Sequence, residues 1–297
     1  MLSILGLGAA SVGITACGGS ASTSDSSRSS GTSAGEIPDE TAGPYPGDGS
    51  NGPDVLEESG IVRSDIRSSF GSANGTAKGV PMTLELTIAD LANDGVPFEG
   101  VAVYVWHCTR EGTYSMYSDG VEDENFLRGV QIADASGKVK FTSIFPACYA
   151  GRWPHIHFEV YRDKSEIDDA KNAIATSQVA LPKHICTKVY AENGYERSVT
   201  NLSQVSLGTD NVFGDDGAKS QLATVSGNVR TGFQVALSVG VDTTTEPSGG
   251  GAPGGSGSPD DGAPPDDEGP PDGGAPPDGE APPDGGSPPT GDEESAS

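Results

Sequence analysis

Alternation of apolar and polar residues dominates the middle of this chain. In residues 82–88 apolar side chains occupy every second position with threonine or glutamate between them, and a similar alternation returns in 101–105 and 139–142. This two-residue period is the pattern of a half-buried β-strand. Residues 222–241 predict two closing strands, and Asn-Asp-Gly at 93–95 predicts a turn. Repeated strands with turn residues between them predict an all-β fold, a β-sandwich with long loops.

Two further segments lack a clear strand pattern. Residues 36–70 contain several prolines and glycines, which predict an extended arm rather than a helix. Residues 168–176 predict a short helix or a structured loop. Residues 36–242 together are long enough for one domain with its own hydrophobic core.

The first residues resemble the signal peptide of a bacterial lipoprotein. Residues 1–16 are small and apolar, and the run is too short to span a bilayer. It leads into Ile-Thr-Ala-Cys-Gly, which resembles a lipobox, so we expect residues 1–17 to be a signal peptide with Cys17 as the lipidation site. Residues 18–35, rich in serine and glycine, are expected to be a flexible tether. Because no Lys or Arg precedes Arg28, we expect the true start to lie upstream of Met1.

This N-terminal pattern predicts an extracytoplasmic protein, lipid-anchored to the bacterial cell membrane or secreted. At the other end, residues 243–297 repeat Ala-Pro-Pro-Asp-Gly with variations and contain no Lys or Arg, which predicts a disordered, acidic Pro/Gly-rich tail. The whole chain carries a net charge of −26 at pH 7. Without a basic stripe, nucleic acid is not an expected partner, and membrane contact is expected only through the lipid anchor. The oligomeric state stays open.

The cysteines indicate which disulfide or thiolate metal site the chain could form. With Cys17 lipidated, Cys108, Cys148 and Cys186 remain. Outside the cytoplasm, such an odd set suggests one disulfide and one free thiol. Every pairing is possible, and we favour Cys108–Cys186 because Cys148, in an extended segment, faces away from the neighbouring Tyr149. A thiolate metal site is disfavoured because no Cys-x-x-Cys spacing occurs.

Most candidate metal-binding and catalytic residues lie in residues 148–160, whose sequence is Cys-Tyr-Ala-Gly-Arg-Trp-Pro-His-Ile-His-Phe-Glu-Val. His155 and His157 are separated by one residue, so on a strand they lie on the same face, about 7 Å apart along the backbone. Two imidazoles on one face can share a metal ion. The simpler interpretation is an ordinary strand with a polar face, but Tyr149 and Arg152 directly upstream favour the metal.

Two histidines leave a metal site incomplete, and tyrosines can complete it. A phenolate oxygen is a hard, anionic donor that suits ferric iron, and a bound cation deprotonates a phenol well below its free pKa of about 10. Tyr117 competes with Tyr114 for this role in Gly-Thr-Tyr-Ser-Met-Tyr at 112–117. A set that would hold Fe(3+) consists of Tyr114, Tyr149, His155 and His157.

Five short motifs lie within residues 80–180, and a weaker one lies at 40–46. The five are Val105-Trp106, Gly112-Thr113-Tyr114, Asp134-Ala135-Ser136-Gly137, Phe145-Pro146-Ala147-Cys148-Tyr149 and Arg152-Trp153-Pro154-His155-Ile156-His157-Phe158. Together they resemble the intradiol ring-cleavage dioxygenases, the family of protocatechuate 3,4-dioxygenase and catechol 1,2-dioxygenase. A tyrosine combined with Arg-x-x-His-x-His is far more specific than His-x-His alone. The two-residue link Ala150-Gly151 is shorter than the loop of the cytosolic enzymes and leaves the substrate open.

The resemblance implies a reaction and a role for each candidate. Arg152 corresponds to the family's arginine that stabilises negative charge on the substrate, and Gln178 to a polar residue lining the substrate pocket. Tyr149 corresponds to the tyrosinate that leaves the metal and accepts a substrate proton. The implied reaction is intradiol cleavage of a catechol-type ring, a small aromatic diol, by O₂ at a non-haem ferric ion, giving a cis,cis-muconate-type product. The implied metal ligands are Tyr114, Tyr149, His155 and His157.

Two other interpretations belong to different classes of protein. One is a non-catalytic, extracellular β-sandwich lipoprotein that binds a partner. The other is a secreted metalloprotein that holds copper or zinc with His155 and His157, the tyrosines being structural. The presence of both tyrosines, both histidines and the arginine in one sequence favours the dioxygenase.

Overall fold

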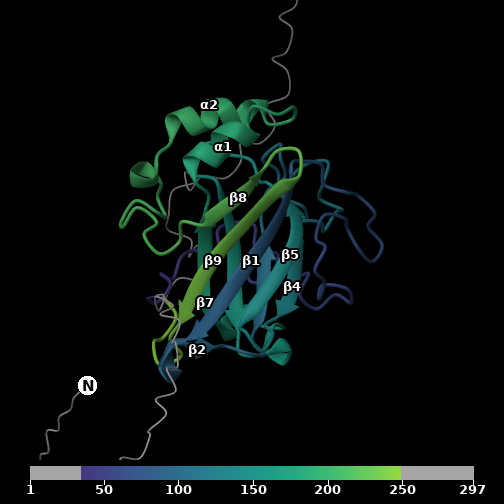
Figure 1. Ribbon diagram of the computed structural model, residues 1–297. Coiled ribbons are helices and arrows are strands. Elements are labelled where there is room, and N and C mark those ends of the chain that lie inside the picture. The colour runs from purple at the N-terminus through teal and green to yellow at the C-terminus, as the bar shows by residue number, and fades with distance from the viewer. Residues whose placement is uncertain (1–34, 249–297) are drawn as a thin grey trace, which may run out of the picture. The chain divides into compact units, whose positions relative to one another are not determined.

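A computed structural model describes residues 35–248, which form two β-sheets (Figure 1). The predictions for the signal peptide, for Cys17 and for most of the tether and tail lie outside the described residues. The first sheet contains β1 (Pro81–Asp90), β2 (Val96–Pro97), β5 (Lys138–Ile144), β8 (Thr224–Asn228) and β9 (Gly232–Val241). The second contains β3 (Ala102–Trp106), β4 (Arg128–Ile132), β6 (His155–Tyr161) and β7 (Ala173–Ala180).

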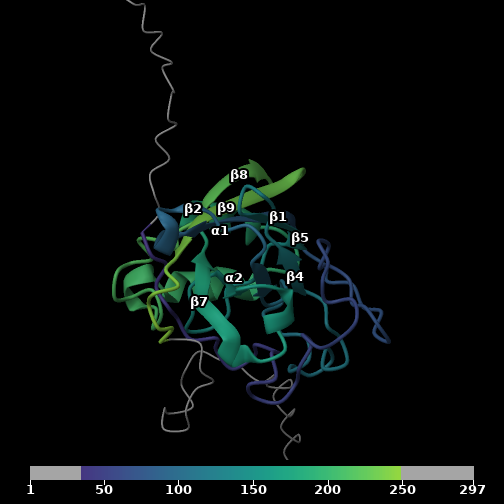
Figure 2. The same cartoon turned by 90° about the horizontal axis from the view of Figure 1, so that it is seen from below.

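Strand β1 organises the first sheet. It pairs in parallel with β9 and antiparallel with β5, while β2 pairs with its last two residues and β8 adds to the far side of β9. The second sheet has the order β4-β3-β6-β7, with every pair antiparallel. Seen from below, β1 and β9 lie in one layer and β4 and β7 in the other (Figure 2). The prediction of an all-β sandwich is therefore confirmed.

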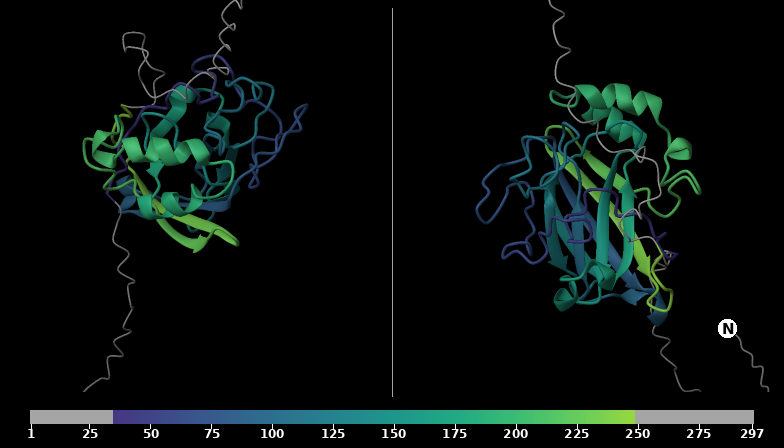
Figure 3. Two further views of the ribbon diagram at one scale, coloured as in Figure 1. Left: turned by 90° about the horizontal axis from the view of Figure 1, so that it is seen from above. Right: turned by 180° about the vertical axis from the view of Figure 1, so that it is seen from behind.

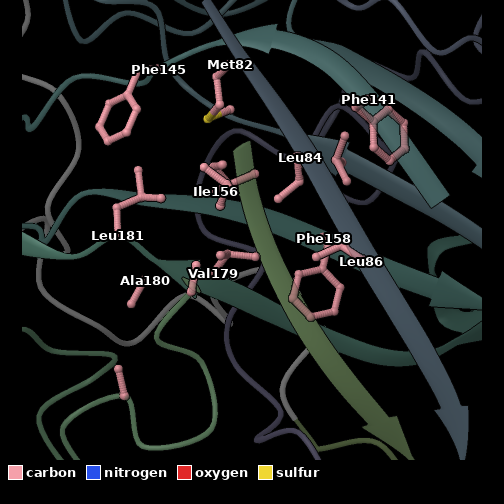
Figure 4. Close-up of a cluster of buried hydrophobic side chains, with 14 of the residues drawn as sticks. Met82, Leu84, Leu86, Phe141, Phe145, Ile156, Phe158, Val179, Ala180 and Leu181 are labelled. Atoms are coloured by element: carbon pink, nitrogen blue, oxygen red, sulfur yellow. The ribbon is translucent and has the colours of Figure 1, made fainter. Parts of the chain in front are cut away.

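The core between the two sheets follows from the alternation in the sequence. Apolar residues of β1, such as Leu84 and Leu86, are buried in one cluster with Ile156 and Phe158 of β6 and Val179 of β7 (Figure 4). These side chains are the apolar residues at every second position of their strands. Their burial against the opposite sheet fixes the register of the strands.

Two short helices were not predicted. They are α1 (Lys183–Val189) and α2 (Glu196–Gln204), and they lie together at one end of the sheets (Figure 1, Figure 3). The remaining elements are 3₁₀ turns: η1 (Leu91–Asn93), η2 (Lys164–Glu166), η3 (Ala170–Asn172) and η4 (Leu207–Thr209). No helix within residues 35–248 is long and apolar enough to cross a bilayer.

The prediction for residues 168–176 is right only for its first part. Turn η3 ends at Asn172, and β7 begins at Ala173. Strand β7 is buried along nearly its whole length, on both faces. A strand buried on both faces shows no alternation of apolar and polar residues, which is why the sequence pattern did not predict it.

The predicted Cys108–Cys186 disulfide is wrong, because all three cysteines of the described chain are free and buried. Cys186, on α1, packs in the cluster between the sheets, whereas Cys108 packs in a second cluster on the outer face of the second sheet. Their thiols face different carbonyl groups, those of Leu181 and Ala147. As predicted, Cys148 and Tyr149 face opposite ways, since Cys148 belongs to the first cluster and Tyr149 to the second.

The arm, residues 36–70, covers the outer face of the second sheet. It has no regular strand or helix, as predicted, but it is fixed by single β-bridges and by Arg128 of β4. The buried guanidinium of Arg128 donates to the carbonyls of Tyr45 and Pro46 on the arm, at 2.9 and 2.6 Å. It also donates to the carbonyl of Ser115, at 2.9 Å, and to the hydroxyl of Tyr104, at 3.0 Å. One side chain thus joins the arm, the loop after β3 and the sheet.

We expect Arg128→Met to lower the free energy of unfolding by about 3 kcal/mol, because several buried carbonyl groups lose their donor. Urea denaturation measures the change, and limited proteolysis should show faster cleavage within residues 36–56. Arg67→Met removes an exposed arginine and serves as the control, with little expected effect. Equal stability of the two variants would contradict the role given to Arg128.

Candidate active site

Strand β6 places both histidines on the outer face of its sheet. Ile156 and Phe158 point into the core between the sheets, so the two-residue period turns His155 and His157 the other way. Both histidines are nevertheless buried, because the arm and the loops cover this face. Across the sheet, His157 lies between Trp106 of β3 and Gln178 of β7. The rings of Trp106 and His157 stack with centroids 4.8 Å apart and planes 7° from parallel.

Three donor atoms converge on this face. His155 Nε2 lies 3.0 Å from His157 Nε2 and 3.1 Å from the hydroxyl of Tyr149. The other ring nitrogen of His155, Nδ1, lies within hydrogen-bond distance of the carbonyl of Trp153. Donating Nδ1–H to this carbonyl leaves a lone pair on Nε2, the arrangement in which a histidine binds a metal ion.

A tight turn brings Tyr149 to the histidines. The amide of Arg152 donates to the carbonyl of Tyr149, at 3.5 Å, and Gly151 has φ +80°. Only glycine adopts this conformation without strain, so the short Ala150-Gly151 link can reverse the chain at once. Helix α2 holds the preceding residue, because Ser198 and Asn201 hydrogen-bond the backbone of Cys148.

Tyr114 comes from the loop after β3 and lies beside this group. Its ring centroid is 6.0 Å from that of Tyr149 and 6.4 Å from that of His157. Its hydroxyl is buried and has no hydrogen-bond partner within residues 35–248. The hydroxyl of Tyr117, in contrast, accepts from the amide of Gly47 and donates to Asn51, each at 2.8 Å. The structure therefore favours Tyr114 over Tyr117 as a donor to the site.

Burial controls the charge of the four donors. It lowers the pKa of His155 to about 3 and that of His157 well below the usual value, so both imidazoles are neutral at pH 7. It raises the pKa of Tyr149 to about 12 and that of Tyr114 well above 10. Neutral imidazoles are ready to bind a metal, whereas the phenols are deprotonated only when a bound cation stabilises the phenolate.

These donors fit a ferric ion better than copper or zinc. Within residues 35–248 no three His, Cys, Asp or Glu side chains are placed to hold a metal. The groups that lie beside His155 and His157 are tyrosines, whose oxygens are hard donors. The buried, unpartnered hydroxyl of Tyr114 is a group that such an ion would satisfy.

Arg152 is buried close enough to this group to act electrostatically on Tyr149 and His155. Its Nε donates to Asp210 at 3.0 Å, and its Nη2 donates to the side-chain oxygen of Gln178 at 2.7 Å. Gln178 also donates to the carbonyl of Thr41 on the arm, at 3.0 Å. The structure therefore brings Gln178 to the arginine that the sequence motif singled out.

Sequence reasoning missed Asp210 and the part that Arg128 plays. Asp210 lies 58 residues from Arg152 in the chain, in a segment where no motif was identified. Arg128 binds the arm and the loop, which carry Tyr45 and Ser115. Tyr45 in turn stacks on Tyr114, with ring centroids 5.0 Å apart. No signal in the sequence identifies these partners, because each pair is joined only by tertiary packing.

Curated relatives match short parts of the chain. A chlorocatechol 1,2-dioxygenase of Rhodococcus opacus is 38% identical over 55 residues, which are 18% of this chain and 21% of that protein. Another, of Pseudomonas sp. strain P51, is 32% identical over 89 residues, 24% of this chain and 35% of that protein. The chain thus matches about a fifth to a third of the length of these curated relatives.

The fold is shared with a solved structure. An intradiol ring-cleavage dioxygenase from Tetranychus urticae superposes with a TM-score of 0.57 at 21% identity, over 73% of this chain and 100% of that one. At this identity the likeness concerns the fold alone. The family Dioxygenase_C, described as Dioxygenase, matches residues 51–235, more than half of the chain. Together with the curated relatives, this match shows that the chain belongs to the intradiol ring-cleavage dioxygenase family.

Proposed function

We propose that the protein is a non-haem Fe(III)-dependent dioxygenase that cleaves a catechol-type ring between its hydroxyl-bearing carbons with O₂. The product would be a cis,cis-muconate-type diacid. The observation that carries the proposal is that His155 Nε2 lies 3.0 Å from His157 Nε2 and 3.1 Å from the hydroxyl of Tyr149, beside the buried, unpartnered hydroxyl of Tyr114. Family membership and the names of the curated relatives support it.

In this proposal the ferric ion is held by Tyr114, Tyr149, His155 and His157. When bound, it would supply Lewis acidity and a template that brings a catechol and O₂ together. Two phenolates would cancel two of its three charges and so favour the ferric over the ferrous state.

The chain's own groups would bind and orient the substrate. The Tyr149 oxygen is the proposed acceptor of a catechol proton. The guanidinium of Arg152 would stabilise negative charge on the substrate from a fixed position. Trp106 stacks on His157 and Tyr45 on Tyr114, so aromatic rings cover two of the four ligands and limit the access of water.

The colour of the protein tests the ligand set. We expect the iron-loaded protein to be burgundy, with a tyrosinate-to-iron band in the visible spectrum. Tyr114→Phe and Tyr149→Phe should shift or bleach this band and suppress turnover, because each removes a phenolate. Tyr117→Phe is the matched control and should leave the band in place, because the Tyr117 hydroxyl bonds Gly47 and Asn51 instead. A colourless protein with a full complement of iron would refute the assignment.

Oxygen uptake tests the reaction. With a panel of catechols, the iron-loaded protein should consume O₂ and give products with the ultraviolet spectrum of cis,cis-muconates. Arg152→Gln should lower kcat by about 100-fold, as expected for the loss of one well-placed charged donor. Metal analysis separates the other interpretations. Copper or zinc without uptake would indicate a different metalloprotein, and no metal would indicate a binding protein.

We also propose that the protein is extracytoplasmic and anchored through a lipid on Cys17. The support is the lipobox-like sequence before a serine- and glycine-rich segment. In a bacterial host, Cys17→Ser should move the protein from the membrane fraction to the soluble fraction, as read by immunoblotting. Equal membrane association of the variant and the wild type would contradict the anchor.

A further inference from the structure

Arg152 is held from two sides in a buried position. Its Nε donates to Asp210 Oδ2 at 3.0 Å, and its Nη2 lies 3.5 Å from Asp210 Oδ1. From the other side, the oxygen of Gln178 accepts from the same Nη2 at 2.7 Å. No hydrogen bond of the third nitrogen, Nη1, occurs within residues 35–248. Two of the three guanidinium nitrogens are thus engaged, and the third is left for another group.

Asp210 is itself fixed independently of the arginine. Its side chain is fully buried and accepts three backbone N–H groups, those of Trp153 at 2.6 Å, Val212 at 2.9 Å and Phe213 at 3.0 Å. Because Trp153 follows Arg152 directly, the carboxylate fixes the backbone at the start of the His-x-His strand as well as the guanidinium. A carboxylate with this many donors has little freedom to move.

We propose that Asp210 is a positioning residue that sets the direction of the Arg152 guanidinium and leaves its Nη1 to face the substrate. Two physical reasons support this. A buried arginine without a carboxylate would be an uncompensated charge and would turn towards water. A second cation next to a ferric site would also be repelled, and the charge of Asp210 offsets that of Arg152.

Gln178 is the second residue that holds the Arg152 guanidinium, but it cannot replace Asp210. Its amide is neutral, so it fixes the plane of the guanidinium without balancing the charge. Through Thr41 it also ties that plane to the arm. The expected effect of Asp210 on turnover rests on the proposed dioxygenase function. The expected effect of Asp210 on the orientation of the Arg152 guanidinium does not depend on that function.

The kinetic test is Asp210→Asn, which keeps the shape of the side chain but removes the charge. We expect kcat to fall by about 10- to 100-fold, the range found when a supporting partner of a site group is lost. The visible band should keep its intensity, because Asp210 hydrogen-bonds none of the four proposed ligands, whereas the loss of its charge acts on Tyr149 and His155 through space and should only shift the position of the band. Asp134→Asn is the control, since Asp134 also accepts backbone N–H groups, those of Ser136 and Lys138, at an exposed turn.

A double-mutant cycle separates positioning from a general structural role. If Asp210 acts through Arg152, adding Asp210→Asn to Arg152→Gln should change kcat by less than about threefold, because the group to be positioned is already gone. If the two losses multiply, or if the band and kcat decline together in Asp210→Asn, the positioning role is overturned.

A readout that needs neither iron nor turnover is the Nε–H resonance of Arg152 in ¹⁵N NMR, identified by its absence in Arg152→Gln. In the wild type it should exchange slowly with water, and in Asp210→Asn it should shift and exchange faster. An unchanged resonance overturns the positioning role, even if the protein proves to be an active dioxygenase. A protected resonance in a protein that takes up no O₂ upholds it while the proposed function fails. Should the variant not fold, a wild-type resonance that exchanges as fast as that of the exposed Arg230 overturns the inference.

Discussion

Strand β6 is buried on both of its faces, and the rest of the site depends on this constraint. One face, with Ile156 and Phe158, packs in the core between the sheets. The other face carries His155 and His157, which are polar and would meet water in a bare two-sheet sandwich. The arm and the loop after β3 cover it, and this burial lowers the pKa of both imidazoles and fixes their positions. The candidate site thus depends on a third layer, formed by the arm and the loop after β3, which has almost no regular strand or helix.

Hydrogen bonds donated by the buried guanidinium of Arg128 hold this third layer in place. Arg128 donates to carbonyl groups of the arm and of the loop, which irregular segments cannot satisfy within themselves. A guanidinium suits this task because its planar fork presents more N–H donors than a lysine ammonium and holds them in fixed directions. Arg152 uses the same geometry differently, with two nitrogens fixed by Asp210 and Gln178 and the third left for the site.

The two-residue link between Tyr149 and Arg152 forms a tight turn that shapes the candidate site. A longer loop would have to pack its own side chains against the donors, whereas the turn at Gly151 places the two functional groups close together at once.

The sequence alone determined the strands whose two faces differ in polarity, such as 82–88, and the common face of His155 and His157. A period of two residues is a local property, and it survives in any fold that buries one face. Tertiary structure alone decided what had no local signal: strand β7 and the two helices, the separation of Cys108 from Cys186, and the pairing of Asp210 with Arg152. It also added a physical reason for preferring Tyr114 to Tyr117, which in the sequence rests on the Gly-Thr-Tyr motif alone, because the two hydroxyls meet different groups. These features depend on contacts between residues far apart in the chain, and such contacts exist only once the sheets, the arm and the loops have packed together.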